Sequence, residues 1–322
     1  MKSLTLEVKP FGGKHSGQRI SDEMQAILDE WKLAKDKLVL MLQDNAANGL
    51  AASRILGVPS LGCVTHGFHL VTSPLFFSKQ KRHAMSQDGC IVSPDALDDY
   101  VDGLDVNDQN IGKVLCERIK RLRSLAKYFS KSPKGAERLG QFVRQCMLNE
   151  LTLILDVVTR WNSSLDMLER LIKLKGAIAM WFVYVATEAG KNEFADFKKV
   201  QPSPSDWYHV ECLILLLAPF KAATEVLSGE KYSTLALAFP ILRLLKKKLR
   251  DGDVLDHINS RYTHAHPDID FSVDVMFMGQ VLFSSESIAA LFDVSQSLLY
   301  FMSRHTCLRN FRPDFQAFRC RL

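Results

Sequence analysis

The clearest pattern in the chain is a short apolar run that leads into a helix-forming segment. Residues 38–42 read Leu-Val-Leu-Met-Leu, a continuous apolar run of strand length, and an Ala- and Leu-rich segment follows. This pattern predicts a strand over residues 37–42 and then a helix. Asp44 and Asn45 fall between the two elements, where such side chains either cap the helix or face a site at the carboxyl end of the strand.

Two other local patterns surround this unit. Residues 1–11 alternate apolar and polar side chains, which predicts a half-buried strand. Ser16 or Ser21 can start the next helix, whose apolar positions recur at three and four residues as far as Trp31. Residues 66–77 are typical of another apolar helix.

From residue 111 onward the spacing of apolar residues is helical. The first helix of this region carries one apolar stripe, made of Leu115, Ile119, Leu122, Leu125, Ala126 and Phe129. Further helices are predicted over 136–148, over 161–185 as one or two helices, from Ser205 or Asp206 to about 227, and from Thr234 onward. The short apolar run at 151–155 fits a helix or a strand. Three tryptophans, Trp31, Trp181 and Trp207, lie in apolar stripes and are expected in the core.

Composition places the chain among globular proteins that are not membrane-embedded. It has 322 residues, of which 47% are hydrophobic and 24% charged, and no apolar run has the length needed to span a bilayer. The seven cysteines are scattered and form no C-x-x-C pair, so neither a disulfide framework nor a zinc module is indicated.

The net charge of +5 is small, but its distribution is uneven. Residues 83–112 contain seven aspartates and no Lys or Arg, whereas basic residues dominate 113–134. The face of the helix opposite the apolar stripe therefore carries Arg118, Lys120, Arg121, Arg123 and Lys127. Such a face is suited to phosphate contacts, although a run of charges on a helix is more often a solvated surface.

Five blocks in order carry a resemblance to a known family. They are LTLEVKPFGGKHSGQRISDEMQAILDEWKL, then CVTHGFHLV, SLAKYFSKSPK, TRWNSSLDMLERL and LAPFKAATEVLSGEKYSTL. In this order and spacing they resemble the hAT superfamily of DNA transposases, whose catalytic domain is an RNase H-like fold interrupted by a helical insertion. The resemblance covers residues 1–250 and weakens after them.

The resemblance implies an α+β fold that is predominantly α-helical. Residues 1–155 would form a partial RNase H-like core that lacks its first two strands, residues 156–252 an all-α insertion domain, and residues 253–322 a poorly matched C-terminal segment. Strands that belong at the centre of a sheet would then lack neighbours, so we expect a gapped sheet and marginal order near the N-terminus.

The resemblance also implies a catalytic position. Transposases of this family hold two Mg²⁺ ions with two aspartates and a glutamate, because one ion activates the attacking oxygen and the other stabilises the leaving oxygen. Asp44 matches the second aspartate, and the other two carboxylates have no counterpart in the chain. We therefore expect Asp44 to bind Mg²⁺ weakly, with no Mg²⁺ cofactor and no strand cleavage by this chain alone.

Two further motifs match the family. Cys63 and His66 match a short Cys-x-x-His motif, for which a structural role beside the strand end and a zinc site are both open. Arg160 and Trp161 match a pair at the start of the helical insertion, where the guanidinium can meet a phosphate and the indole can stack on an unpaired base. The alternative is that Trp161 fills the interface between the core and the insertion.

These patterns favour a transposase-derived protein that binds DNA. The alternatives are a fragment of an active Mg²⁺-dependent transposase, a helical protein-interaction module, and a decayed reading frame without function. The family's usual dimerisation segment is apparently absent, so a monomer or a weak association is expected. Nuclear localisation follows only from the resemblance, since Lys-Gln-Lys-Arg-His at 79–83 is too short for a dependable import signal.

Overall fold

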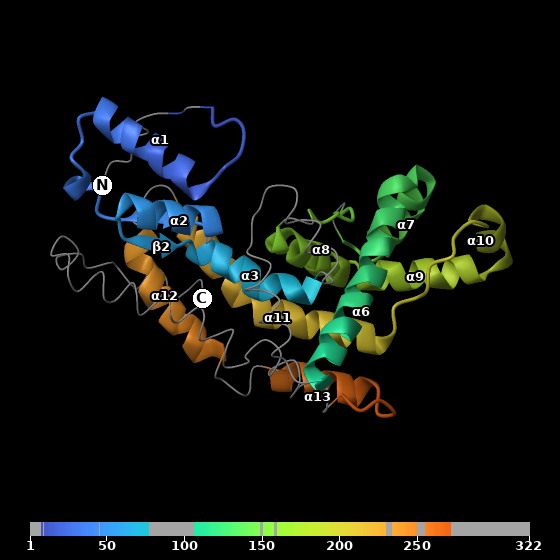
Figure 1. The fold of residues 1–322 in the computed structure, drawn as a ribbon. Coiled ribbons are helices and arrows are strands. Elements are labelled where there is room, and N and C mark those ends of the chain that lie inside the picture. Colours follow the sequence, from blue (N-terminus) through green and yellow to red (C-terminus); the bar gives the residue numbers. More distant parts are fainter. Residues whose placement is uncertain are drawn as a thin grey trace.

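In the computed structural model, the described residues are 8, 10–44, 46–76, 106–148, 151–157, 160–229, 234–249 and 255–271. Helices dominate them (Figure 1). The helices are α1 (Gly17–Glu30), α2 (Ala47–Leu56), α3 (Val64–Phe76), α6 (Val106–Lys131), α7 (Pro133–Gln145), α8 (Trp161–Lys173), α9 (Lys175–Ala186), α10 (Glu188–Glu193), α11 (Pro204–Leu227), α12 (Thr234–Leu249) and α13 (Asp256–Ala265), with a short 3-10 helix at Lys35–Lys37. The strands are β1 (Met41–Gln43) and β2 (Ser60–Gly62).

The first part of the fold is a small layer of α1, α2 and two strands. Ser16 caps α1 by accepting a hydrogen bond from the Arg19 amide, as one of the two predicted starts requires. β1 and β2 pair in parallel, with Met41 opposite Ser60. β2 was not predicted, because Ser-Leu-Gly carries no strand pattern, and β1 begins four residues later than predicted, after the 3-10 turn.

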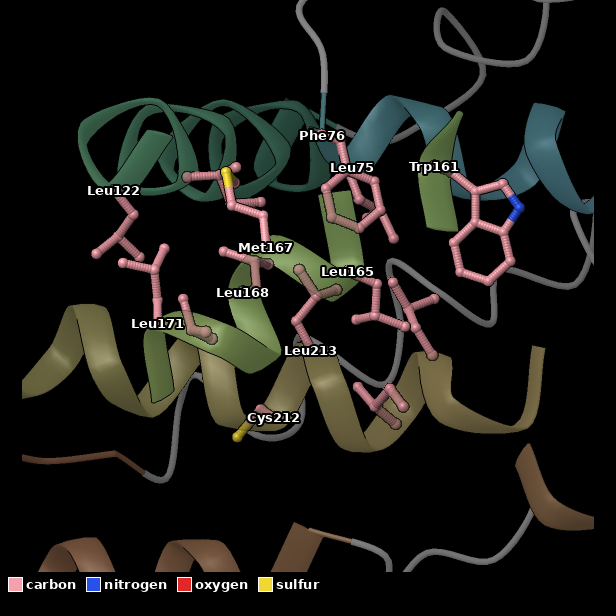
Figure 2. Close-up of a cluster of buried hydrophobic side chains, with 14 of the residues drawn as sticks. Leu75, Phe76, Leu122, Trp161, Leu165, Met167, Leu168, Leu171, Cys212 and Leu213 are labelled. Atoms are coloured by element: carbon pink, nitrogen blue, oxygen red, sulfur yellow. The ribbon is translucent and has the colours of Figure 1, made fainter. Parts of the chain in front are cut away.

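The second part is a helical assembly built around α11 and α8. α11 is a helix of 24 residues that contacts α3, α6, α8, α12 and α13. Figure 2 shows the core between α6 and α11, with α8 lying between them and presenting Trp161, Leu165 and Leu168 to this core. Each fully buried leucine contributes about 1.5–3 kcal/mol by leaving water. All six residues of the apolar stripe predicted on α6 are buried, so that prediction is confirmed.

Several boundaries differ from the predictions for local reasons. Ser203, not Ser205 or Asp206, caps α11: its hydroxyl accepts from the Asp206 amide, and the Asp206 carboxylate accepts from the Ser203 amide. The run at 151–155 is neither helix nor strand. Trp31 is 48% exposed at the end of α1, so its predicted core position is wrong, whereas Trp181 and Trp207 are buried as predicted.

The predicted fold class, α+β and predominantly helical, is confirmed by the long helices and the single two-stranded sheet among the described residues. Within this part of the chain, no helix is both long enough and apolar enough to cross a membrane. The predicted strand at 1–11 and the acidic stretch at 88–108 lie outside or only partly inside the described residues. The domain boundaries after 155 and 252 stay predictions.

Candidate nucleic-acid interface

The outward face of α6 carries cations that are free to meet a ligand. Because the apolar stripe of this helix is buried against α3, α7, α8 and α11, the opposite face is in solvent. Lys120, Lys127 and Lys131 are exposed on it, with no hydrogen-bond or ion-pair partner among the described residues. Their spacings of seven and four residues are close to whole helical turns, so the three amines form a row along roughly 16 Å of the helix.

Arg118 and Arg121 lie closer to α11 and are partly neutralised there. Asp206, in the first turn of α11, is nearly buried, and its Oδ1 lies 3.1 Å from Arg121 Nη2 and 3.6 Å from Arg118 Nη1. Arg118 Nη1 also lies 3.0 Å from His209 Nδ1. The Arg121 side chain remains 52% exposed, while that of Arg118 is 19% exposed. Of the two, Arg121 is therefore the one that can still reach a phosphate.

Arg123 is committed to an internal ion pair. Its Nε and Nη2 donate to both carboxylate oxygens of Asp156 at 2.7–3.0 Å, a bidentate arrangement between α6 and the segment before α8. The Ser164 hydroxyl donates to the same carboxylate at 2.8 Å. Burial alone would raise the pKa of Asp156, but the hydrogen bonds and the charge of Arg123 outweigh it and hold this pKa below its ordinary value.

Trp161 and Arg160 occupy the start of α8 and differ in exposure. Trp161 is 3% exposed and lies at one end of the α3–α8–α11 core (Figure 2), which corresponds to the interface-filling alternative. In this conformation its indole is not available to stack on a base. Arg160, at the N-cap position of α8, is exposed and makes no side-chain cap bond there. Of this motif, only Arg160 is therefore accessible.

Asp44 lies at the carboxyl end of β1, as predicted, and is exposed. Its Oδ1 accepts a hydrogen bond from the Ala46 amide at 3.2 Å, while α2 starts after Ala46 without a side-chain cap. The carboxylate thus supports the turn just before α2, a role close to the predicted alternative of a helix cap. Asn45, the other residue predicted at this position, lies outside the described residues.

Two histidines of α3, His66 and His69, have lowered pKa values. Burial lowers the pKa of His66, and the negative charge of Asp44 counteracts part of that shift. Burial, together with the charge of His66, lowers the pKa of His69 to about 4, so His69 is neutral near pH 7. Cys63 donates its amide to Gln43 and its Sγ lies 3.0 Å from Thr65 Oγ1.

The donor set does not fit a metal. Among the described residues, no group of three or more His, Cys, Asp or Glu side chains could hold an ion. Asp44 offers a single carboxylate, whereas a two-metal site needs several oxygen ligands from acidic side chains. We therefore derive no chemical step through Mg²⁺, and the hydrogen bonds of Cys63 suit the structural alternative for its motif.

Sequence reasoning missed the acidic partners that decide which cations are free. Asp156 and Asp206 are separated from their arginines by 33 and 85 residues, so no local pattern could pair them. A partial signal existed at Asp206, because Ser203 followed three residues later by an acidic residue is typical of a capping box. It indicates a buried carboxylate at a helix start, although not its arginine partners.

Comparison with known proteins gives relatives over much of the chain. Residues 101–214 match the model of the ZBED1 RNase-like helical domain. The chain is 25% identical over 248 residues to zinc finger BED domain-containing protein 4 of Homo sapiens, covering 77% of this chain and 17% of that protein. It is 26% identical over 229 residues to a Zea mays protein named as an AC transposase, covering 70% of this chain and 24% of that protein.

A third relative is named as a transcriptional regulator, tpeD, of Talaromyces stipitatus; it is 24% identical over 259 residues, which cover 76% of this chain and 28% of the relative. The chain thus spans between 17% and 28% of the length of these curated relatives. No solved structure matches it significantly.

Proposed function

This chain belongs to the hAT-type, transposase-derived proteins, and from that premise we propose that it binds DNA through the exposed face of α6 and does not cleave strands by itself. The observation that carries this proposal is the row of Lys120, Lys127 and Lys131, which have no counter-charge among the described residues. Free amines in a row are suited to successive backbone phosphates, whose counterions are released on binding.

The mode of binding follows from what the face contains. Its exposed side chains are charged or polar (Glu117, Lys120, Arg121, Lys127, Ser130 and Lys131) and none is aromatic, while Trp161 is buried, so base stacking has no platform on this surface. Phosphate contacts position a protein on DNA without reading its sequence. We therefore expect binding that depends strongly on salt and weakly on sequence. Arg121 and Arg160, both exposed, are candidates for additional contacts at the margins of the row.

The test is fluorescence anisotropy of the purified chain with a labelled duplex over a salt series. We expect Lys120→Ala, Lys127→Ala and Lys131→Ala together to lower the slope of log affinity against log salt by about 3, roughly one per phosphate contact. A control with the same charge change replaces exposed lysines near α10, namely Lys191, Lys198 and Lys199. An equal loss in the control, or no binding of the parent chain at low salt, contradicts the proposal.

The absence of cleavage is proposed from the single carboxylate at the β1 end. Asp44 alone cannot clamp two Mg²⁺ ions on attacking and leaving oxygens. We expect supercoiled plasmid to remain intact with the protein and Mg²⁺, and Asp44→Ala to leave DNA affinity unchanged. Mg²⁺-dependent nicking that disappears in Asp44→Ala would favour the alternative, a fragment of an active transposase.

Nuclear localisation is part of the same proposal. It is supported by relatives named as a BED zinc finger protein and a transcriptional regulator. A fluorescent fusion of the full chain that stays in the cytosol would contradict it.

A further inference from the structure

Within the described part of the chain, the outer edge of β1 pairs with no other strand. In the parallel ladder, the Met41 amide donates to the Pro59 carbonyl at 2.9 Å and the Gln43 carbonyl accepts from the Cys63 amide at 2.6 Å. Backbone groups of alternate residues point to the same side of a strand, so those of Met41 and Gln43 face β2. The N–H and C=O of Leu42 therefore point away from β2, where no described residue bonds to them.

The side chains along this edge are apolar and solvent-exposed. Leu42 is 59% exposed and Val39, two residues before the strand, is 48% exposed. Leu61, which pairs with Leu42 in the ladder, is only 6% exposed. Parallel strands are normally covered on both faces, and a two-stranded sheet is only marginally stable by itself. The edge is therefore a template for another strand.

We propose that this edge pairs with the same edge of a second copy of the chain, antiparallel and centred on Leu42. Around a two-fold axis, the Leu42 N–H of each copy donates to the Leu42 C=O of the other copy. Two reciprocal hydrogen bonds therefore join the two copies of Leu42. The result is a four-stranded sheet in the order β2-β1-β1-β2, with the two exposed Leu42 side chains in contact.

The charges at the two ends of the strand fit this arrangement. The segment before β1 contains exposed Lys35, Asp36 and Lys37, with a net positive charge, and exposed Asp44 follows it. Antiparallel pairing brings the basic end of one copy beside the acidic end of the other. It also holds the two Asp44 residues four positions out of register, about 14 Å apart along the strands, where they repel little.

The edge is short, so the association is weak. Three residues of strand and a few exposed side chains bury less than the roughly 800 Å² per partner of a standard interface. Dimerisation is therefore expected at micromolar or higher protein concentration. This inference is independent of DNA binding, because it uses β1 and not α6.

The test is light scattering after size-exclusion chromatography of the full chain from about 5 to 300 μM, a range chosen for weak interfaces. We expect a concentration-dependent dimer that Leu42→Lys weakens at least about tenfold, since a lysine on an edge opposes pairing. The control Ile55→Lys changes an exposed apolar residue of α2, 47% exposed against 59% for Leu42, and this variant should dimerise as the parent chain does. A chain that is monomeric throughout, or a dimer unaffected by Leu42→Lys, overturns the proposal.

Cross-linking tests the register even where Leu42→Lys folds poorly. In the proposed pair the two Leu42 Cα atoms lie about 5.5 Å apart, within the range of a disulfide. Leu42→Cys should therefore form a covalent dimer under mild oxidation. Val39→Cys should not, because the two copies of residue 39 lie six positions out of register, about 20 Å apart. Equal cross-linking by both variants overturns the proposed register.

Discussion

Replacing Arg123 by alanine should destabilise the fold strongly and leave the DNA surface unchanged. The guanidinium makes three donor–acceptor contacts of 2.7–3.0 Å with Asp156, and the two side chains are 14% and 3% exposed. Without Arg123, the buried carboxylate keeps the Ser164 hydroxyl as a side-chain donor. Breaking a buried pair from one side costs about 3–5 kcal/mol. For a domain stable by about 5–15 kcal/mol, that loss is a large fraction of the total.

The assay is urea denaturation followed by circular dichroism for the single and double variants. Asp156→Ala should cost less than Arg123→Ala, because the arginine left behind can turn toward solvent. The double variant, Arg123→Ala together with Asp156→Ala, should recover part of the stability lost in Arg123→Ala, because no unpaired charge stays buried. The double-mutant cycle then gives the coupling energy between the two side chains. Lys127→Ala, on the exposed face of the same helix, is the control and should change stability by less than about 0.5 kcal/mol.

The result that refutes this reasoning is an Arg123→Ala protein that is as stable as the parent but binds DNA more weakly. Such a result would place Arg123 on the surface with the lysines. The pH dependence gives a second check. The pKa of Asp156 is lower in the folded protein than in the unfolded chain, so its contribution is complete above about pH 4 and is lost as the pH falls through the folded value.

Two other predictions concern α3 and α8. Because the pKa of His69 is about 4 in the folded protein and about 6.5 in the unfolded chain, the contribution of His69 to stability should be complete above about pH 6.5 and be lost as the pH falls from 6.5 to 4. This difference in pKa corresponds to at most about 3 kcal/mol of folding free energy, and to less for a partly solvated ring. In urea denaturation, His69→Leu should flatten the decline of the midpoint with falling pH. An unchanged decline contradicts this prediction. Trp161→Ala should cost about 3–5 kcal/mol in urea unfolding and leave the DNA affinity of the folded protein unchanged, whereas reduced affinity would indicate a stacking role.

The helices with a clear apolar period could be predicted from the sequence, because their burial follows from local spacing. The stripe on α6 is the best example: one face of a helix must be covered, and the period identifies which one. β2 shows the limit. Its three residues form a strand only because Met41 and its neighbours pair with them. Pairing with another strand imposes no recognisable sequence pattern on so short a segment.

The candidate site was predictable in position but not in detail. The sequence indicates that basic residues gather on one helix, yet Arg121 and Arg123 face acidic residues that are distant in the chain. Trp161 shows the same limit for aromatic residues. A tryptophan at a helix start can stack on a base or fill a core, and only the packing of α3, α8 and α11 around it distinguishes the two.

This difference between total and available charge can be measured. If all five basic residues predicted on α6 contacted phosphates, log affinity would fall with log salt at a slope of about 4.5, at roughly 0.9 per contact. The structure leaves Lys120, Lys127 and Lys131 without counter-charge and commits Arg123 to Asp156, so the expected slope from this face is about 2.7. Contacts from the exposed Arg121 and Arg160 would raise this slope to about 4.5 without breaking a buried ion pair. Only a slope above that value would require Arg118 and Arg123 to leave their acidic partners on binding, so a slope of about 4.5 or less is the result expected if the ion pairs of α6 survive in the complex.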